Sequence, residues 1–252
     1  MTAETNWKKL WMRGGFPESL LAPTDDLSFE WRRSFIRSYT ERDLPLLGLS
    51  AEPMLIRRFW QMLAGNNAGI WQSEKYANSL NVHHATVKRY ADFLEHAYLI
   101  DRLYPWFPNV SKRLVKSPKV YQSDTGLLHT FLNINFLDDL LGSASLGASW
   151  EAFAIRQIKT ALQGRLECYF YRTHQGAECD LVLVSGTQPL AGIEIKFGAT
   201  PAISKGFYTA IADLKTPNNY VLISEGASFQ LKENLWVVSL ADFLNDHLPK
   251  LR

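Results

Sequence analysis

The sequence predicts an α/β protein with a helical N-terminal portion and a C-terminal mixed sheet flanked by helices. Two observations support this fold class. Apolar residues recur at helical spacing in several stretches between residues 27 and 97. From residue 120 onward, short β-rich runs alternate with helical segments, which is typical of a sheet with partly parallel strand order.

Composition gives few restrictions on the function. The chain has 252 residues, a net charge of +2 and 46% hydrophobic residues, as expected for a folded globular protein. Affinity for nucleic acid would therefore have to come from a local basic patch. The sequence has no signal peptide and no apolar run of the roughly 18 residues that a membrane span needs, so we expect a cytoplasmic protein without a membrane partner. Two cysteines are too few for a disulfide framework.

Residues 1–50 are expected to form a helical segment of their own. The stretch 27–44 has its apolar residues near helical spacing. Thr24 precedes it and can cap its N-terminus, and the two acids that follow Thr24 suit the positive end of the helix dipole.

Residues 51–119 are expected to form a winged helix-turn-helix. One helix is predicted over 54–64, a short one over 73–80, and a longer one over 83–97 after a tight turn. A strand is predicted over 99–106. A helix, a tight turn, a longer helix and then a strand is the pattern of a winged helix.

Within residues 120–252, a β-hairpin is predicted near the middle. The runs 179–184 and 190–197 are rich in β-branched and apolar residues, and the turn segment 185–189 separates them. If the hairpin is centred on Thr187, each residue pairs with the one equally far from Thr187 on the other strand.

This register gathers charged side chains on one face of the hairpin. Asp180 falls opposite Glu194, and Glu178 falls opposite Lys196. Because side chains alternate between faces along a strand, these four share a face and leave the other face apolar.

Such a cluster points to metal chemistry. Carboxylates on facing strand positions have Cβ atoms about 5 Å apart and repel each other unless a cation lies between them. Their hard oxygen atoms suit Mg²⁺, so Asp180 and Glu194 are candidate ligands. Lys196 would orient or deprotonate an attacking water, or stabilise charge on a phosphate. The alternative is a salt bridge of Lys196 with a neighbouring acid on a solvated sheet face.

A further acid, Glu151, lies early in a predicted helix at 147–162, next to the apolar Trp150. An acid beside apolar surface is a candidate for a role in the same site. Complementarity with the helix dipole is the competing explanation.

The pattern of a helix acid, a strand aspartate and a Glu-x-Lys strand resembles the PD-(D/E)XK restriction-endonuclease-like superfamily. The resemblance implies that Glu151 is the helix acid, Asp180 the strand aspartate, Glu194 the second carboxylate and Lys196 the lysine. It also implies a mixed sheet flanked by helices over residues 120–252 and a Mg²⁺-dependent nuclease-like site.

A second resemblance covers nearly the whole chain. The segments that carry it are RGGFPE (13–18), ERDL (41–44), NVSKRLVKSPKVYQSDTGLL (109–128), GASWEAFAI (147–155), YRTHQGAECDLVL (171–183) and GIEIK (192–196). They resemble the C-terminal region attached to prokaryotic, archaeal-type AAA-like ATPases, which implies an ATPase domain, a winged helix and a nuclease-like fold in that order. The sequence contains no G-x-x-x-x-G-K-[ST] motif, so no ATP site is expected. Residues 1–50 are then interpreted as the remnant of a connection between ATPase and winged helix, in a truncated or split gene product or in a protein that works without ATP.

Basic residues suggest where DNA would bind. The second helix of the helix-turn-helix offers Lys88 and Arg89. The segment 111–119 offers four cations with no acid among them, namely Lys112, Arg113, Lys116 and Lys119. A solvated basic loop is the alternative.

Three functions remain open from the sequence. The first is a Mg²⁺-dependent DNA-processing nuclease. The second is a non-catalytic module that binds DNA or protein. The third is a regulatory part of a split AAA-type ATPase, bound to an ATPase partner in trans.

Overall fold

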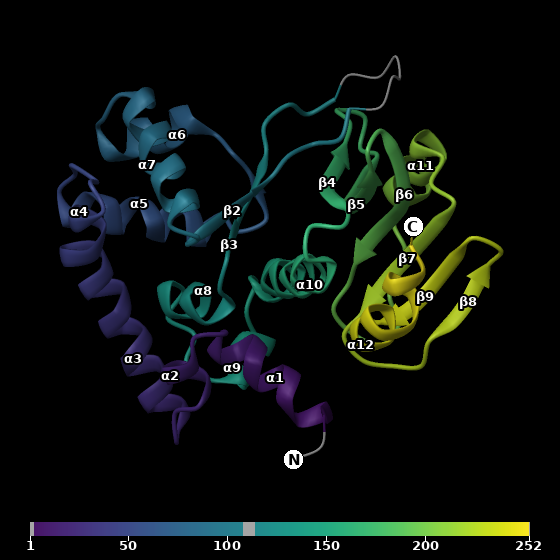
Figure 1. Ribbon diagram of the computed structural model, residues 1–252, viewed down its shortest axis with the longest axis horizontal. Coiled ribbons are helices and arrows are strands. Elements are labelled where there is room, and N and C mark those ends of the chain that lie inside the picture. The colour runs from purple at the N-terminus through teal and green to yellow at the C-terminus, as the bar shows by residue number, and fades with distance from the viewer. Residues whose placement is uncertain (1–2, 108–113, 252) are drawn as a thin grey trace. The chain divides into compact units, whose positions relative to one another are not determined.

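The computed structural model describes residues 3–107 and 114–251. The chain is an α/β protein that divides into two compact units (Figure 1). The first unit contains the residues up to Arg102 and Val120–Ala152, and the second contains Leu103–Lys119 and Phe153–Arg252. The expected boundary at residue 119 therefore does not separate the two units, because residues 103–119 belong with the C-terminal sheet and 120–152 with the N-terminal helices.

Helices dominate the first unit. In chain order they are α1 (Ala3–Arg13), α2 (Pro17–Leu20), α3 (Asp25–Ser38), the π-helical η1 (Tyr39–Asp43), α4 (Leu44–Leu46), α5 (Pro53–Gly65), α6 (Ser73–Leu80), α7 (His84–His96), α8 (Thr125–Phe131) and α9 (Leu137–Leu141). The expected cap of α3 is confirmed, since the Leu27 N–H donates to Thr24 Oγ1 at 3.2 Å. The expected bounds of α6 are also confirmed, and Asn81 ends it with a left-handed φ of 52°. The helix α10 (Leu146–Leu162) begins among the residues of the first unit and ends among those of the second.

A three-stranded sheet accompanies these helices. Its strands β1 (Gly69–Ile70), β2 (Ile100–Leu103) and β3 (Lys119–Gln122) lie in the order β1-β3-β2. The elements therefore follow one another as α5, β1, α6, α7, β2 and β3.

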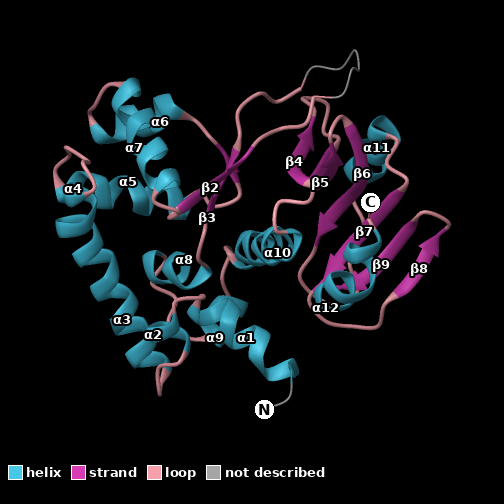
Figure 2. Ribbon diagram, in the orientation of Figure 1, coloured by secondary structure: helices cyan, strands magenta, loops and turns pink. Residues whose placement is uncertain are grey.

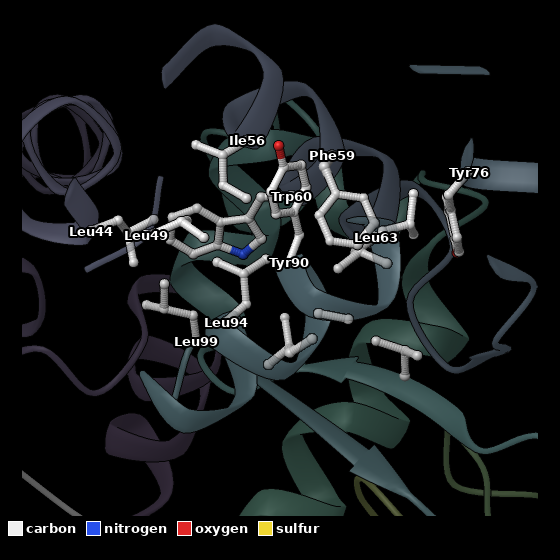
Figure 3. Packing of buried hydrophobic residues seen from close by; sticks show 14 of the residues in the cluster. Leu44, Leu49, Ile56, Phe59, Trp60, Leu63, Tyr76, Tyr90, Leu94 and Leu99 are labelled. Atoms are coloured by element: carbon white, nitrogen blue, oxygen red, sulfur yellow. The ribbon is translucent and has the colours of Figure 1, made fainter. Parts of the chain in front are cut away.

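The core of the first unit is built on one face of α5. Ile56, Phe59, Trp60 and Leu63 recur at helical spacing and are fully or almost fully buried (Figure 3). Burial of each large apolar side chain contributes about 2 kcal/mol. The indole N–H of Trp60 donates to Gln122 Oε1 at 2.7 Å, so the strand β3 is tied to this core by a satisfied polar contact.

The second unit contains a mixed six-stranded sheet in the order β4-β5-β6-β7-β9-β8 (Figure 2). The strands are β4 (Glu167–Arg172), β5 (Glu178–Ser185), β6 (Gln188–Ile195), β7 (Asn218–Ile223), β8 (Phe229–Lys232) and β9 (Leu235–Ser239). The first three are antiparallel, β6, β7 and β9 are parallel, and β8 pairs antiparallel with β9 at the edge. The expectation of a mixed, partly parallel sheet is confirmed.

Helical segments flank this sheet. The helix α11 (Lys205–Leu214) connects the parallel strands β6 and β7 and buries Phe207 and Ala210 in the same hydrophobic core as β5. The chain ends in the short segments α12 (Leu240–Asp242), η2 (Phe243–His247) and η3 (Leu248–Lys250). Across the described part of the chain, no helix has the length and apolar content to cross a bilayer.

Candidate functional site

The pairing of β5 with β6 follows the register expected from the sequence. Leu181 faces Ile193, and the next two pairs toward the turn keep that register. Closer to the turn the register shifts by one residue, so that Ser185 pairs with Gln188. The shift leaves a tight two-residue turn at Gly186 and Thr187, where Gly186 has a φ of 58° that glycine adopts without strain.

Beyond the Leu181–Ile193 pair, side chains of β5 replace main-chain pairing. The Ile193 N–H donates to Cys179 Sγ at 3.2 Å, and the Ile195 N–H donates to Asp180 Oδ2 at 2.9 Å. The Asp180 carboxylate is therefore held by a main-chain donor of the neighbouring strand. Burial raises the pKa of the Cys179 thiol, which keeps it protonated and unreactive.

Glu194 is buried, with 3% of its surface exposed. The Lys196 ammonium lies 3.1 Å from Glu194 Oε1, and the Ser204 N–H lies 3.4 Å from both carboxylate oxygens. Ser204 is the N-cap of α11, so the positive end of that helix also faces this carboxylate. Lys196 itself is partly exposed and reaches solvent from this position.

Lys119 also belongs to this cluster, and this placement was not predicted from the sequence. It was expected in an exposed basic loop, yet it is only 3% exposed. Its ammonium lies 3.2 Å from Glu178 Oε1 and 3.5 Å from Asp180 Oδ1, above the ring of Phe170. A buried cation of this kind is expected to be paired, and here one lysine contacts two carboxylates of one strand.

Contacts along β4 explain how Lys119 reaches these acids. The Val115 N–H donates to the Arg172 carbonyl at 3.0 Å, and Leu114 forms an isolated bridge with Thr173. The segment that leads into β3 is thus paired with the end of β4, next to β5. One sequence signal was available, since Lys119 directly precedes the apolar run of a short buried strand.

The observed ion pairs differ from the facing pairs expected, which were Asp180 with Glu194 and Glu178 with Lys196. Glu178 contacts Lys119, and Arg172 at 3.5 Å, while Lys196 contacts Glu194. The structure thus brings Asp180, Glu194 and Lys196 to the same end of the β5–β6 pair, with Lys119 added.

Glu151 lies in the first unit, early in α10 as expected. The Tyr121 hydroxyl of β3 donates to its carboxylate Oε1 at 2.6 Å, which orients the side chain.

The expected DNA-contacting residues fall into three groups. Lys88 and Arg89 are exposed on α7, and Lys116 is exposed before β3. Lys112 and Arg113 lie outside the described residues. Lys119, as shown above, is buried in the second unit.

Among the residues that the structure describes, no group of three or more His, Cys, Asp or Glu side chains is arranged to hold a metal ion. The two expected ligands, Asp180 and Glu194, are therefore not part of a larger metal-binding group among these residues.

Two mycobacterial proteins are similar to this chain over most of its length. It is 38% identical over 230 residues to "Uncharacterized protein Rv2008c" of Mycobacterium tuberculosis (strain ATCC 25618 / H37Rv) and to "Uncharacterized protein Mb2031c" of Mycobacterium bovis (strain ATCC BAA-935 / AF2122/97). Each match covers 91% of this chain and 52% of the relative, so the chain spans about half the length of the curated relatives it matches. No solved structure matches the chain.

Two family models match consecutive parts of the sequence. Residues 146–243 match Domain of unknown function (DUF4143), which is associated with AAA ATPases, and this supports the expected relationship to such proteins. Residues 4–138, more than half of the chain, match Domain of unknown function (DUF8612), and the protein therefore belongs to that family.

Proposed function

We propose that the second unit is a PD-(D/E)XK restriction-endonuclease-like domain that cleaves DNA with Mg²⁺, using Asp180, Glu194 and Lys196. The proposal rests on the arrangement of side chains at the end of the β5–β6 pair. There an aspartate and a Glu-x-Lys motif lie on neighbouring strands at the point where side chains replace main-chain pairing.

The chemistry of two carboxylates suits the proposed ion. Asp180 and Glu194 would supply carboxylate oxygens, the ligands that Mg²⁺ prefers, and would leave positions for water and phosphate oxygens. Bound there, the ion would activate a water and polarise a phosphodiester.

Side chains of the protein would position the reacting groups and stabilise charge. The Ile195 N–H donates to Asp180 Oδ2 and fixes the direction of this carboxylate, while Lys119 lies 3.5 Å from Oδ1. Lys196, partly exposed, can stabilise negative charge that develops on a phosphate.

We also propose that the elements from α5 to β3 form a winged helix that contacts DNA. Their order and the β1-β3-β2 sheet support this assignment. Lys88 and Arg89, both exposed on α7, would contact phosphates. Lys119 is excluded from such contacts because it is buried.

A cleavage assay tests the first proposal. Supercoiled plasmid and branched DNA would be incubated with wild-type protein, Asp180→Ala and Lys196→Ala in Mg²⁺ or Mn²⁺. We expect cleavage by the wild type, its loss in both variants, and its retention in the matched control Lys205→Ala, which changes an exposed lysine of α11. Equal cleavage by all four proteins would indicate a contaminant and reject the nuclease.

One observation favours a second function, a non-catalytic module that binds DNA or protein as part of an AAA-type ATPase system. Lys119 lies 3.5 Å from Asp180 Oδ1, so this carboxylate has a cationic partner without a metal ion. The AAA-associated family of residues 146–243, and relatives of which this chain covers 52%, suggest an ATPase as the partner. Gel-shift experiments distinguish this function, because DNA binding should then persist in Asp180→Ala and fall in Lys88→Gln/Arg89→Gln without any cleavage.

A further inference from the structure

A hollow on the surface of the first unit combines two arginines with no acid. It has a volume of about 230 Å³ and lies between α3, α5 and the end of α8. Arg33 lines it from α3, Arg57 and Gln61 from α5, and Asn133 from the turn after α8. No carboxylate lines it among the residues that the structure describes.

Within the described part of the chain, the two arginines have no acidic partner. In the described ranges, neither Arg33 nor Arg57 forms an ion pair or a side-chain hydrogen bond. Arg33 instead lies over the ring of Phe29, with its guanidinium carbon 6.0 Å from the ring centroid. Like charges that line one small hollow repel each other, and an anion between them would reverse this effect.

A third guanidinium lies behind the wall of the hollow. Arg32 is 1% exposed, and its Nε donates to the hydroxyl of Thr130, a residue that lines the hollow. Burial lowers the pKa of Arg32 to about 10, which leaves it charged at neutral pH, and the charge of Asp124 offsets part of its field. The wall therefore adds a positive charge in surroundings that screen it weakly.

We propose that this hollow binds a phosphate group between the guanidinium groups of Arg33 and Arg57. A planar guanidinium donates two parallel hydrogen bonds to phosphate oxygens, and a doubly charged tetrahedral anion can use both arginines at once. The side-chain amides of Gln61 and Asn133 supply further donors. This site is independent of the proposed cleavage site in the second unit. Its ligand is a phosphate monoester or free phosphate, and the 5′ end of a nucleic acid strand would present the same chemistry.

Calorimetric titration of the full chain in low-salt chloride buffer tests this site. The probes are inorganic phosphate and a dinucleotide with and without a 5′-phosphate. We expect saturable binding to the wild type and a loss of about tenfold or more in Arg33→Gln/Arg57→Gln, as removal of charged hydrogen bonds predicts. Arg58→Gln is the matched control, because Arg58 is an exposed neighbour on α5 that does not line the hollow. Its affinity should equal that of the wild type.

The probes also separate the two sources of phosphate. Equal affinity for inorganic phosphate and the phosphorylated dinucleotide supports a free phosphate ligand. Tighter binding of the phosphorylated dinucleotide, with none of the unphosphorylated one, supports a strand end. The site is rejected if no phosphate probe binds the wild type, or if Arg58→Gln weakens binding as much as the double variant.

Thermal unfolding distinguishes a loss of phosphate binding from a folding defect in the variants. Because neither arginine has an acidic partner among the described residues, the double variant should keep the wild-type melting temperature without phosphate and lose its rise with phosphate. The single variant Arg33→Lys keeps the charge without the bidentate geometry and should bind with intermediate affinity. A melting temperature that rises with phosphate equally in all variants would overturn the proposal.

Discussion

The buried ammonium of Lys119 lies 3.2 Å from the carboxylate of Glu178 and also contacts Asp180 on the same strand. Only 4% of the lysine side chain is exposed, so water cannot take over its role. Glu178 and Asp180 of β5 thus share one buried cation from a distant part of the sequence, and Glu178 also contacts Arg172.

Lys119→Met should therefore destabilise the protein. Removing one partner of a buried ion pair leaves the other charge with less compensation. The cost here is about 3 kcal/mol, because Glu178 is partly exposed and keeps its contact with Arg172. Urea unfolding measures this change. The exposed Lys116→Met should stay within about 0.5 kcal/mol of the wild type, and Asp180→Asn should restore part of the loss in the Lys119→Met background. An unchanged stability would contradict the role given to Lys119.

The same substitution tests the proposed ion site. If Lys119 competes with a divalent cation for Asp180, its removal should raise the affinity for Mn²⁺ by about tenfold, since one unit of positive charge leaves the site. Electron paramagnetic resonance of free Mn²⁺ gives this affinity without any cleavage. Asp180→Asn should weaken the binding, and an affinity that does not change in Lys119→Met would refute the competition.

Stability should fall in mild acid because of His129. Its ring nitrogens contact the Met12 carbonyl and the Ser149 hydroxyl, and burial lowers its pKa from 6.5 to about 4. The unfolded chain then binds an extra proton between these values, so the contribution of His129 is complete above pH 6.5 and is lost as the pH falls toward 4. It amounts to about 3 kcal/mol.

Chemical denaturation at a series of pH values measures the contribution of His129 to the free energy of unfolding. In His129→Gln the slope of unfolding free energy between pH 4 and 6.5 should be smaller than in the wild type. Equal slopes would assign the acid sensitivity to other groups.

Gly126 should not tolerate a methyl group. A Cβ there would lie 2.2 Å from the Arg13 carbonyl oxygen, which already accepts a hydrogen bond from Ser19 Oγ. Gly126→Ala should cost about 3 kcal/mol, since the backbone must move.

Gly147→Ala is the matched control for this measurement. Gly147 lies in α10 with nothing within 4 Å of the added methyl, and the higher helix propensity of alanine should stabilise the protein by about 0.5 kcal/mol. Equal effects of the two substitutions would show that the close approach at Gly126 is relieved without cost.

Local sequence patterns were sufficient to predict the elements whose ends are marked by turn-forming residues. The bounds of α6 follow from its helical spacing and from Asn81 at its end, and the β5–β6 register follows from a hairpin with one apolar face. The strand β8 was not predicted, because all four of its residues are exposed and it has no buried face to set an alternation.

Long-range pairing could not be predicted from the sequence. Lys119 stands among other cations, so its surroundings in the sequence indicate an exposed basic loop. Its burial depends on the pairing of residues near 115 with the end of β4, some 57 positions away along the chain (Val115 to Arg172). Nothing in the composition of either segment encodes that contact.

The interleaving of the two units has a consequence for how such genes can recombine. Each unit is assembled from two separate stretches of chain, with residues 103–119 of one placed between the stretches of the other. A single breakpoint, wherever it falls between residues 103 and 152, would split both units, so neither would be exchanged intact. We therefore expect that the two units are inherited together, and that a recombinant fragment starting at residue 120 lacks Lys119 together with the rest of that inserted stretch.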